Sequence, residues 1–283
     1  MALKDARGQV FGTTHTPQRI VSLVPSWTEA LFAFGAGDRV AGVTDYCIYP
    51  ADGVAGKPKI GGTKNPRVDQ ILALAPDLVI ANIEENRKID VAALQARGVP
   101  VFATFARTVR AAIDELRAVA ELVNAQNADA IIAPIEHALA SAPRLVRRPR
   151  VFVAIWRDPW MTANGETYIG DLIETCGGEN IFRERERCFP LAADLGGAPA
   201  RETETRDTRY PRVSLEEISA QKPDVILLPD EPYRFSERDA DELGALPALR
   251  HTRIHLIDGT LVAWYGVRTG RAIESISKLL ESE

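Results

Sequence analysis

The sequence predicts an α/β protein built of two similar lobes, each with a mainly parallel sheet, joined by a helical connection. Residues 68–80 and 215–227 align without a gap at an offset of about half the chain. Each of these segments has the pattern of a short helix, a Pro-Asp break and a continuous apolar run, which is typical of a strand buried on both faces. A second echo pairs residues 20–24 with residues 151–155, because each is an apolar run before a helical pattern that stops at a glycine. A repeat of this length indicates a duplicated domain and not a solenoid array.

In the first lobe, apolar runs alternate with helical patterns along the chain. This alternation predicts parallel strands with helical crossovers, and therefore a doubly wound sheet. Strands are expected near residues 19–24, 39–43, 78–81 and 99–102, and helices at residues 27–34, 68–74 and 88–97.

An Ala-rich stretch with helical periodicity, residues 108–142, follows without a strand. We expect one helix to Asn124 and a second over residues 129–140 that links the lobes. Pro134 fits the second helix poorly, because a proline in a helix interior costs about 3 kcal/mol unless it opens a new helix at its first turn. These patterns divide the chain into an N-terminal lobe over residues 1–124, a connecting helix over 125–148 and a C-terminal lobe over 149–283.

The second lobe repeats the alternation and adds a long polar segment, residues 183–209, that has no counterpart in the first lobe. This segment is charged, contains glycine and lacks a clear period, so we expect a surface insertion. Ser214, with Glu217 three positions on, predicts a capping box at the start of the next helix. Strands are expected at residues 150–155, 225–228 and 254–257, and helices at residues 168–176, 214–220 and from Arg268 onward.

Composition excludes several classes of protein. With 283 residues, 46% of them hydrophobic, the chain can fill two cores of ordinary domain size. The formal net charge of −5 and the absence of a Lys/Arg block argue against nucleic acid as a partner. The densest basic cluster, Arg147, Arg148 and Arg150, is expected to be only the solvated start of a strand. No run approaches the roughly 20 apolar residues of a membrane span.

The N-terminus and the cysteines bear on the compartment. Residues 1–9 lack the apolar core of an export signal, so the chain either stays inside the cell or has lost its signal. Cys47, Cys176 and Cys188 have no metal-ligand spacing. Cys176 and Cys188 could close a small loop, but a reduced chain is the simpler expectation.

The motifs of common enzyme classes are missing. Residues 35–40 imitate the start of a dinucleotide-binding fingerprint, but they follow a helix and lack the third glycine. The sequence contains no P-loop and no GxSxG nucleophile elbow. His251 and His255 flank a strand start, where four residues separate them by roughly 13 Å, too far for a shared metal ion. The sequence therefore predicts neither a metal site nor catalytic residues.

Large aromatic side chains fall just beyond the predicted strands or in the loops that follow them. In open parallel sheets, ligands bind outside the carboxyl ends of the strands, so these rings stand where a ligand would lie. Each ring either contacts a ligand or caps the core of its own lobe, and the residues alone leave both possibilities open. The set is Trp27, Trp156, Trp160 and Trp264, with Tyr46, Tyr233 and Tyr265 in similar places.

Asp69 and Glu216 occupy matching positions in the duplicated segments, each in the first turn of its helix. The helix dipole stabilises an acidic side chain there by about 0.3 to 1 kcal/mol, and the residues alone favour this structural explanation. The alternative is that two symmetric acidic side chains face one partner.

Five segments together carry a resemblance to a known family: residues 19–29, 42–50, 71–79, 176–182 and 210–214. They resemble the cobalamin and iron-siderophore binding proteins of bacterial ABC importers, with the cobalamin binders as the nearest branch, over nearly the whole chain except the insertion. The resemblance implies two Rossmann-like lobes joined by one long backbone helix, with the ligand in the cleft between them and little hinge closure. It also implies no catalysis, no intrinsic cofactor, a monomer and a location in the periplasm or cell envelope.

The resemblance changes the interpretation of the two acidic residues. It implies that Asp69 and Glu216 dock onto arginines of the membrane permease, one from each lobe, and so favours function over the structural explanation. Charge pairs at such a rim would steer docking more than they would add affinity.

The sequence departs from the cobalamin binders at several positions. Thr63, Asn82 and Tyr210 stand where those proteins carry tryptophans, so the ligand can differ. The family's second-lobe disulfide is missing, because Ser277 stands near the partner position of Cys176. A relative that works inside the cell therefore remains an alternative.

We expect a non-catalytic receptor that holds a metal chelate, first of all a corrinoid such as cobalamin and next haem or a ferric siderophore, for an ABC importer. The rival hypothesis is an intracellular enzyme or metallochaperone acting on a corrinoid or other metal cofactor, which needs a titratable group in the cleft, and Asp45, Glu84 and Glu85 are its candidates. The expected flat contacts are Trp27, Tyr46, Trp156, Tyr210, Trp264 and Tyr265, and the expected orienting groups are Asn82, Glu85, Arg157 and Arg268.

Overall fold

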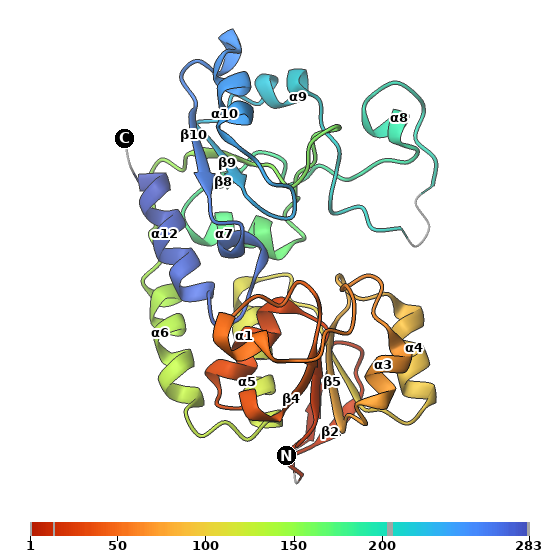
Figure 1. Cartoon of the computed structure of the whole chain (residues 1–283). Helices are drawn as coiled ribbons and strands as arrows, with labels where there is room; N and C mark the ends of the chain where they lie inside the picture. Colours follow the sequence, from red (N-terminus) through yellow and green to blue (C-terminus); the bar gives the residue numbers. More distant parts are fainter. Residues whose placement is uncertain (1, 14, 203–205, 282–283) are drawn as a thin grey trace. The chain divides into compact units, whose positions relative to one another are not determined.

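The computed structural model describes residues 2–13, 15–202 and 206–281 (Figure 1). The chain divides into two compact units. Unit 1 consists of Met1–Ala106 and Arg110–Glu136, and unit 2 consists of Arg107–Val109 and His137–Glu283. Each unit holds one parallel sheet with its own helices, which confirms the predicted α/β fold class.

The sheet of unit 1 contains four parallel strands in the order β4-β3-β5-β6. All residues of β3, β5 and β6 are buried, as expected for strands covered on both faces. The sequence predicted all four strands but not the short antiparallel hairpin of β1 and β2 that precedes them. The bounds are β1 Ala2–Lys4, β2 Val10–Gly12, β3 Ile20–Ser22, β4 Val40–Val43, β5 Leu78–Asn82 and β6 Val101–Thr104.

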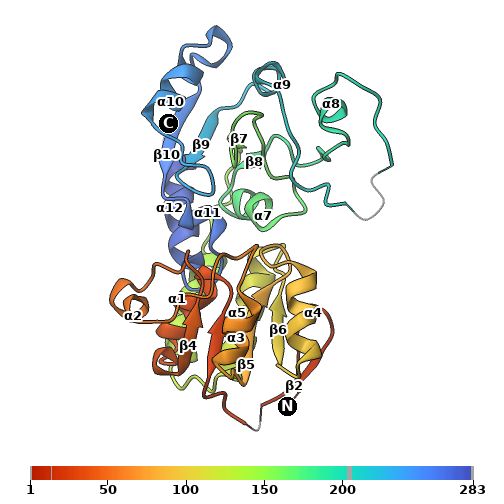
Figure 2. The same cartoon turned by 45° about the vertical axis from the view of Figure 1, so that its right-hand side comes forward.

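Helices connect these strands, and both views show α3 and α4 beside each other along one flank of the sheet (Figures 1 and 2). Pro134, which was expected to fit this helix poorly, lies inside α6 and not in a first turn. The helix ends at Ala140, and the division between the units falls within it. The bounds are α1 Pro25–Ala33, η1 Gly37–Arg39, α2 Ala51–Ala55, α3 Val68–Ala73, α4 Lys88–Ala96, α5 Val109–Leu122 and α6 Ala128–Ala140.

The sheet of unit 2 has the order β10-β9-β7-β8, again with parallel neighbours. Its core gathers the aromatic side chains of Phe152, Trp160, Phe182 and Phe235 around the apolar strands β7 and β9. The sequence did not predict the short strand β8 or the helix α10. The strands are β7 Arg150–Val153, β8 Glu179–Asn180, β9 Val225–Pro229 and β10 Arg253–Ile257, and the helices are α7 Tyr168–Thr175, α8 Leu191–Asp194, α9 Leu215–Ala220, α10 Glu237–Gly244, η2 Pro247–Leu249, α11 Thr260–Ala263 and α12 Thr269–Glu281.

The two sheets have the same topology. When only the strands of each parallel sheet are counted, in chain order, the second strand lies at one edge and is followed by the first, the third and the fourth. The duplicated segments of the sequence are α3–β5 in unit 1 and α9–β9 in unit 2, at equivalent places in this order. Even the backbone agrees, because Ala75 and Lys222, which follow the two helices directly before the Pro-Asp pairs, both have positive φ angles, of 45° and 49°. The predicted duplication is therefore confirmed at the level of backbone geometry.

The insertion of residues 183–209 follows β8, belongs to unit 2 and carries the short helix α8. Both views show α8 well away from the sheet of its own unit. The chain returns along residues 161–165, where Met161 bridges Arg212 and the Asn164 N–H donates to the Arg209 carbonyl at 2.9 Å. The insertion is therefore tied to the loop that follows β7.

Candidate functional site

The carboxyl ends of the parallel strands are the places to look for a site. In a sheet whose order reverses after the first strand, the loops on either side of that reversal diverge and leave room for a ligand. The reversal lies between β3 and β5 in unit 1 and between β7 and β9 in unit 2. The loops beside the reversal follow β3 and β5 in unit 1 and β7 and β9 in unit 2, and the loops after β4 and β10 leave the same ends of their sheets.

In unit 1, two buried asparagines fasten the loops after three strands together. The Asn82 side chain accepts hydrogen bonds from the backbone N–H groups of Glu84 and Glu85, at 2.8 and 3.1 Å, and donates to Thr104 Oγ1 at 3.2 Å. Asn86 donates to the carbonyls of Leu23 and Thr63, at 3.3 and 3.0 Å, and accepts from the Asn82 N–H. Asn82, expected to orient a ligand, thus has its amide groups engaged within the scaffold.

Trp27 belongs to the same buried network. Its side chain is 0% exposed, and the indole N–H donates to Thr104 Oγ1 at 2.8 Å. The apolar helix α1 turns this ring into the core of unit 1, so it has no face left at the surface of that unit. Trp27 was expected to supply a flat contact to the ligand, but its ring packs in the core of unit 1. Thr63, another departure from the cobalamin binders, is also buried.

Tyr46, in the loop after β4, has the opposite environment. Its side chain is 63% exposed and lines a hollow of about 310 Å³. Gly62 lets the ring come close, because a Cβ added there would lie 3.2 Å from the Tyr46 ring and 2.4 Å from Asn65 Oδ1. The other lining residues are Asp45, Gly61, Asn65 and Arg67. Tyr46 can therefore present an aromatic face to a ligand.

The edge of unit 1 also holds a buried carboxyl that the sequence did not single out. Glu115 of α5 accepts a 2.5 Å hydrogen bond from the Phe105 N–H, just beyond β6, while its Oε2 is buried with no partner among the described residues. Burial raises the pKa of Glu115 to about 7, against the hydrogen bond from Phe105, and the charge of Glu84 adds to the rise. Of the acidic residues proposed for a catalytic role, Glu85 is exposed and Glu84 half-buried.

In unit 2, Trp156 follows β7 and is 44% exposed. Its ring meets the Tyr233 ring edge-on, with centroids 5.5 Å apart, so one face stays available. Arg157 lies next to it but forms ion pairs with Asp239 and Glu242 of α10 and covers the Trp160 ring, which is buried. The guanidinium that was expected to orient the ligand thus forms ion pairs with two carboxylates, and these hold the pKa of Arg157 above its usual range.

Trp264 and Tyr265 lie together between α11 and α12, and both are mostly buried. The Arg268 guanidinium covers the Trp264 ring at 5.2 Å and donates to Thr260 Oγ1 at 2.6 Å. The Tyr265 ring packs on Tyr168, with centroids 5.2 Å apart. This cluster brings three of the predicted residues together, although it offers less aromatic surface than Trp156.

Glu231 stands beside this cluster, directly after β9, and the sequence did not identify it. Burial raises its pKa to about 7, against a hydrogen bond from Trp264, and the charges of Asp230 and Asp258 add to the rise. A Cβ on Gly259 would approach the Glu231 side chain to 2.4 Å, so a side chain at residue 259 would collide with this carboxyl. The Asp-Glu-Pro sequence at the end of β9 was the signal from which Glu231 could have been identified.

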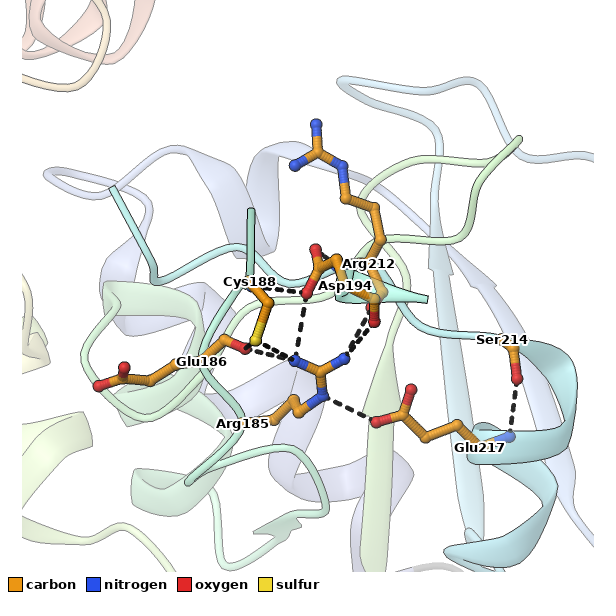
Figure 3. Close-up of polar contacts among 7 residues, drawn as sticks. All are labelled: Arg185, Glu186, Cys188, Asp194, Arg212, Ser214 and Glu217. Carbon is orange, nitrogen blue, oxygen red and sulfur yellow. Dashed lines mark hydrogen bonds and ion pairs between the residues drawn. The ribbon is translucent and has the colours of Figure 1, made fainter. Parts of the chain in front are cut away.

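The two matching acidic residues are both exposed in the first turns of their helices, Asp69 in α3 and Glu216 in α9. Their surroundings differ. Ser214 caps α9 by accepting from the Glu217 N–H at 3.1 Å, but the Glu217 carboxylate pairs with Arg185 of the insertion at 2.8 Å (Figure 3). The Ser236–Asp239 pair of α10 forms a complete capping box.

The remaining predicted residues have packing or surface environments. Tyr210 is half-buried, with the Arg209 guanidinium 5.5 Å from its ring. All three cysteines are free, and burial raises the pKa of Cys176 to about 12. Among the residues that the structure describes, no group of three His, Cys, Asp or Glu side chains could hold a metal ion, and no helix is long and apolar enough to cross a membrane.

Known proteins similar to this chain share most of its length. A family model described as periplasmic binding protein matches residues 20–259. The vitamin B12-binding protein of Vibrio parahaemolyticus is 24% identical over 269 residues, covering 93% of this chain and 88% of its own length. The vitamin B12-binding protein of Yersinia pestis is 27% identical over 215 residues, covering 75% of this chain and 69% of its own.

Solved structures give the same result for the fold. The apo form of the periplasmic heme-binding protein RhuT from Roseiflexus superposes with a TM-score of 0.72 at 26% identity, covering 93% of this chain and 97% of that protein. The periplasmic vitamin B12-binding protein of Vibrio cholerae gives a TM-score of 0.70 at 21% identity, covering 94% and 97%.

Proposed function

The chain belongs to the periplasmic binding protein family, and on that premise we propose that it is a non-catalytic receptor for a metal chelate with a flat macrocycle. Cobalamin is the first ligand to consider and haem the second, because relatives named for each share the length and fold of this chain. A ferric siderophore comes third. The receptor would deliver its ligand to an ABC importer from the periplasm or cell envelope.

One observation of the structure supports this proposal most directly: an exposed aromatic ring follows a strand in each unit. Tyr46 follows β4 and Trp156 follows β7, and both rings are exposed, whereas the other candidate rings are half-buried or buried. Ligands of such sheets bind outside the carboxyl ends of the strands, and flat aromatic rings suit the face of a corrin or porphyrin. The partly buried polar groups Arg157 and Arg268 would act at the margin of such a site.

Titration of the purified protein with cyanocobalamin and with haemin, followed by the absorbance of each chelate, tests the proposal. We expect saturable one-to-one binding of one of the two. Replacement of Trp156 by alanine should weaken that binding about tenfold, because it removes a desolvated aromatic contact. Ile89→Ala is the matched control, since Ile89 is an exposed apolar residue of α4.

Two results would contradict the proposal. One is that cyanocobalamin, haemin and a ferric siderophore all fail to bind at high micromolar concentration. The other is equal affinity for the wild-type protein and for a double variant with Trp156→Ala and Tyr46→Ala, because then neither exposed ring contacts the ligand.

A further inference from the structure

The insertion of unit 2 contains a second hollow, about 330 Å³ in volume, that the receptor function leaves unexplained. Arg201 and Arg206 line it together with Phe189, Pro190 and Glu202. Arg187 lies beside it, with its guanidinium 4.5 Å from the centre of the Phe189 ring, and the Arg206 guanidinium is 5.0 Å from the same ring. We call this site the insertion hollow.

The three guanidiniums around the insertion hollow have no carboxylate partner among the described residues. The nearby acids are already engaged, because Asp194 pairs with Arg185 and Asp207 with Arg209. Among the described residues that line the hollow, Glu202 is the only acidic one. Within the described part of the chain, three positive groups therefore gather around one negative group, and like charges held this close repel one another unless an anion joins them.

Arg187 shows the imbalance most clearly. Its Nε is buried and has no hydrogen-bond partner among the described residues. Burial lowers its pKa, the charge of Arg206 acts in the same direction, and the charges of Asp194 and Asp207 oppose the shift. Stacking on Phe189 covers the face of a guanidinium but leaves its in-plane N–H donors directed outward, and a buried donor without an acceptor is costly.

The backbone that carries these arginines is firmly held (Figure 3). Asp194 is buried and accepts from the N–H groups of Cys188 and Arg212, both at 2.8 Å, and from Arg185 Nη1 at 3.1 Å. The Arg201 N–H donates to the Phe189 carbonyl at 2.9 Å, and the Arg187 N–H to the Thr208 carbonyl at 2.7 Å. These bonds position Arg187 and Arg201 around the hollow before any ligand arrives.

We propose that the insertion hollow binds an oxyanion, a phosphate or carboxylate group, between the guanidiniums of Arg187, Arg201 and Arg206. The planar fork of arginine matches these two groups in a bidentate manner. The group can come from a free ion or from an acidic substituent of the chelate, because haem carries two carboxylates and cobalamin a phosphodiester. The site itself does not depend on the receptor function.

Isothermal titration of the chelate-free protein with inorganic phosphate and with citrate tests the site. At least one of the two should bind, and the affinity should fall with added salt. Arg187→Gln and Arg206→Gln should each weaken that binding by about tenfold, because each removes hydrogen bonds to a charged group. Arg238→Gln is the matched control, since Arg238 is exposed on α10 of the same unit.

Absence of binding of both anions by the wild-type protein at about 10 mM would overturn the proposal. So would an affinity that Arg187→Gln and Arg206→Gln leave unchanged while circular dichroism shows both variants folded. Repeating the titration on chelate-loaded protein identifies the source of the anion: lost phosphate binding assigns the site to a substituent of the chelate, and unchanged binding assigns it to a free ion. Failure of chelate binding would leave the first titration interpretable, so the two proposals can fail separately.

Discussion

The two units are held in the same way at the amino ends of their sheets and in different ways at the carboxyl ends. In unit 1, the Asp77 carboxylate accepts from the Arg19 N–H at 2.9 Å, and the Arg19 guanidinium donates to the Leu74 carbonyl at 2.8 Å. In unit 2, Asp224 accepts from the Arg150 N–H at 2.8 Å, and the Arg150 side chain donates to the Gln221 carbonyl at 3.0 Å. The Pro-Asp motif is therefore a clamp that fixes the first strand to the end of the preceding helix.

The carboxyl ends have diverged. Unit 1 closes its loops with the neutral amides of Asn82 and Asn86, whereas unit 2 uses the ion pairs of Arg157 and the charged group around Arg268. The comparison indicates that the two units have kept the same contacts at the amino ends of their strands and have changed at the carboxyl ends. We therefore expect recognition at the carboxyl ends of the strands, where the two units differ.

The tryptophans of the two units give the largest expected effect. Trp27→Ala should lower the free energy of unfolding by about 3–5 kcal/mol, because it opens a cavity in the core of unit 1 and leaves Thr104 without its indole donor. Trp156→Ala should change the unfolding free energy far less, by about 1 kcal/mol or below, since that ring is partly exposed. Urea unfolding followed by circular dichroism measures both. Equal losses would contradict the assignment of one ring to packing and the other to recognition.

Two carboxyls whose pKa values are raised to about 7, one in each unit, predict a dependence of stability on pH. Glu115 has a folded-state pKa of about 7, above its ordinary value of 4.5, so the folded protein binds more protons than the unfolded chain between these values. Stability should therefore be highest below about pH 4.5 with respect to this group and fall as the pH rises through 7, by up to about 3 kcal/mol. Glu115→Gln should remove that fall, whereas a variant that keeps the full pH dependence would exclude Glu115 as its source.

Glu231 should act in the same direction in unit 2, because burial raises its pKa to about 7 as well. It is only partly buried, so Glu231→Gln should remove a smaller part of the stability loss between pH 5 and pH 7 than Glu115→Gln does. Thermal unfolding at several pH values compares the two variants. A larger change in the pH dependence of stability for Glu231→Gln than for Glu115→Gln would contradict the conclusion that Glu115 is the more deeply buried carboxyl.

The equivalent clamps should contribute equally. Asp77→Ala and Asp224→Ala should each destabilise the protein by about 1.5–3 kcal/mol, because each removes a charged acceptor from backbone N–H groups at the start of a strand. Asp52→Ala serves as a control, since Asp52 lies in the short helix α2 away from either clamp. A clear difference between the two clamp variants in urea unfolding would show that the duplicated motif has lost its role in one unit.

The smallest effect on stability belongs to the matching acidic residues. Asp69→Ala and Glu216→Ala should each lower the free energy of unfolding only slightly, because an exposed acidic side chain in a first helical turn interacts weakly with the helix dipole. If both residues dock onto a permease, Asp69→Arg with Glu216→Arg should abolish ligand uptake through the importer while chelate binding stays intact. Normal uptake by this double variant would leave only the structural explanation.

Much of the fold followed from the sequence, and the reason is local. Buried parallel strands show as apolar runs, as at residues 78–82, and helix ends show as glycine or Pro-Asp breaks. Most of the elements that were missed are short, such as β8 and α8, and carry no period of their own, whereas α10 was missed although Ser236 and Asp239 form a capping box at its start. The arginine cluster at residues 147–150, expected to be only solvated, contains Arg148 bonded to Glu174 and Arg150 in a clamp, because their partners lie far away in the sequence.

The candidate site followed from the sequence only in outline. The aromatic residues were located after the strands, but their exposure was not, so Trp27 and Trp156 looked alike until packing separated them. Glu115 and Glu231 were missed because a raised pKa depends on burial by several elements and leaves no mark in the local pattern. Arg157 follows Trp156 in the sequence, but its carboxylate partners on α10 could not be foreseen.

The sequence by itself determined the duplication, the α/β alternation and the strand ends at which recognition residues stand, because backbone hydrogen bonding and hydrophobic period act over a few neighbouring residues. Only the tertiary structure decided which rings face solvent, which carboxyls have raised pKa values and which arginines lack a carboxylate partner among the described residues. These properties depend on desolvation and charge pairing among residues that are distant along the chain, as with Arg157 and its partners Asp239 and Glu242.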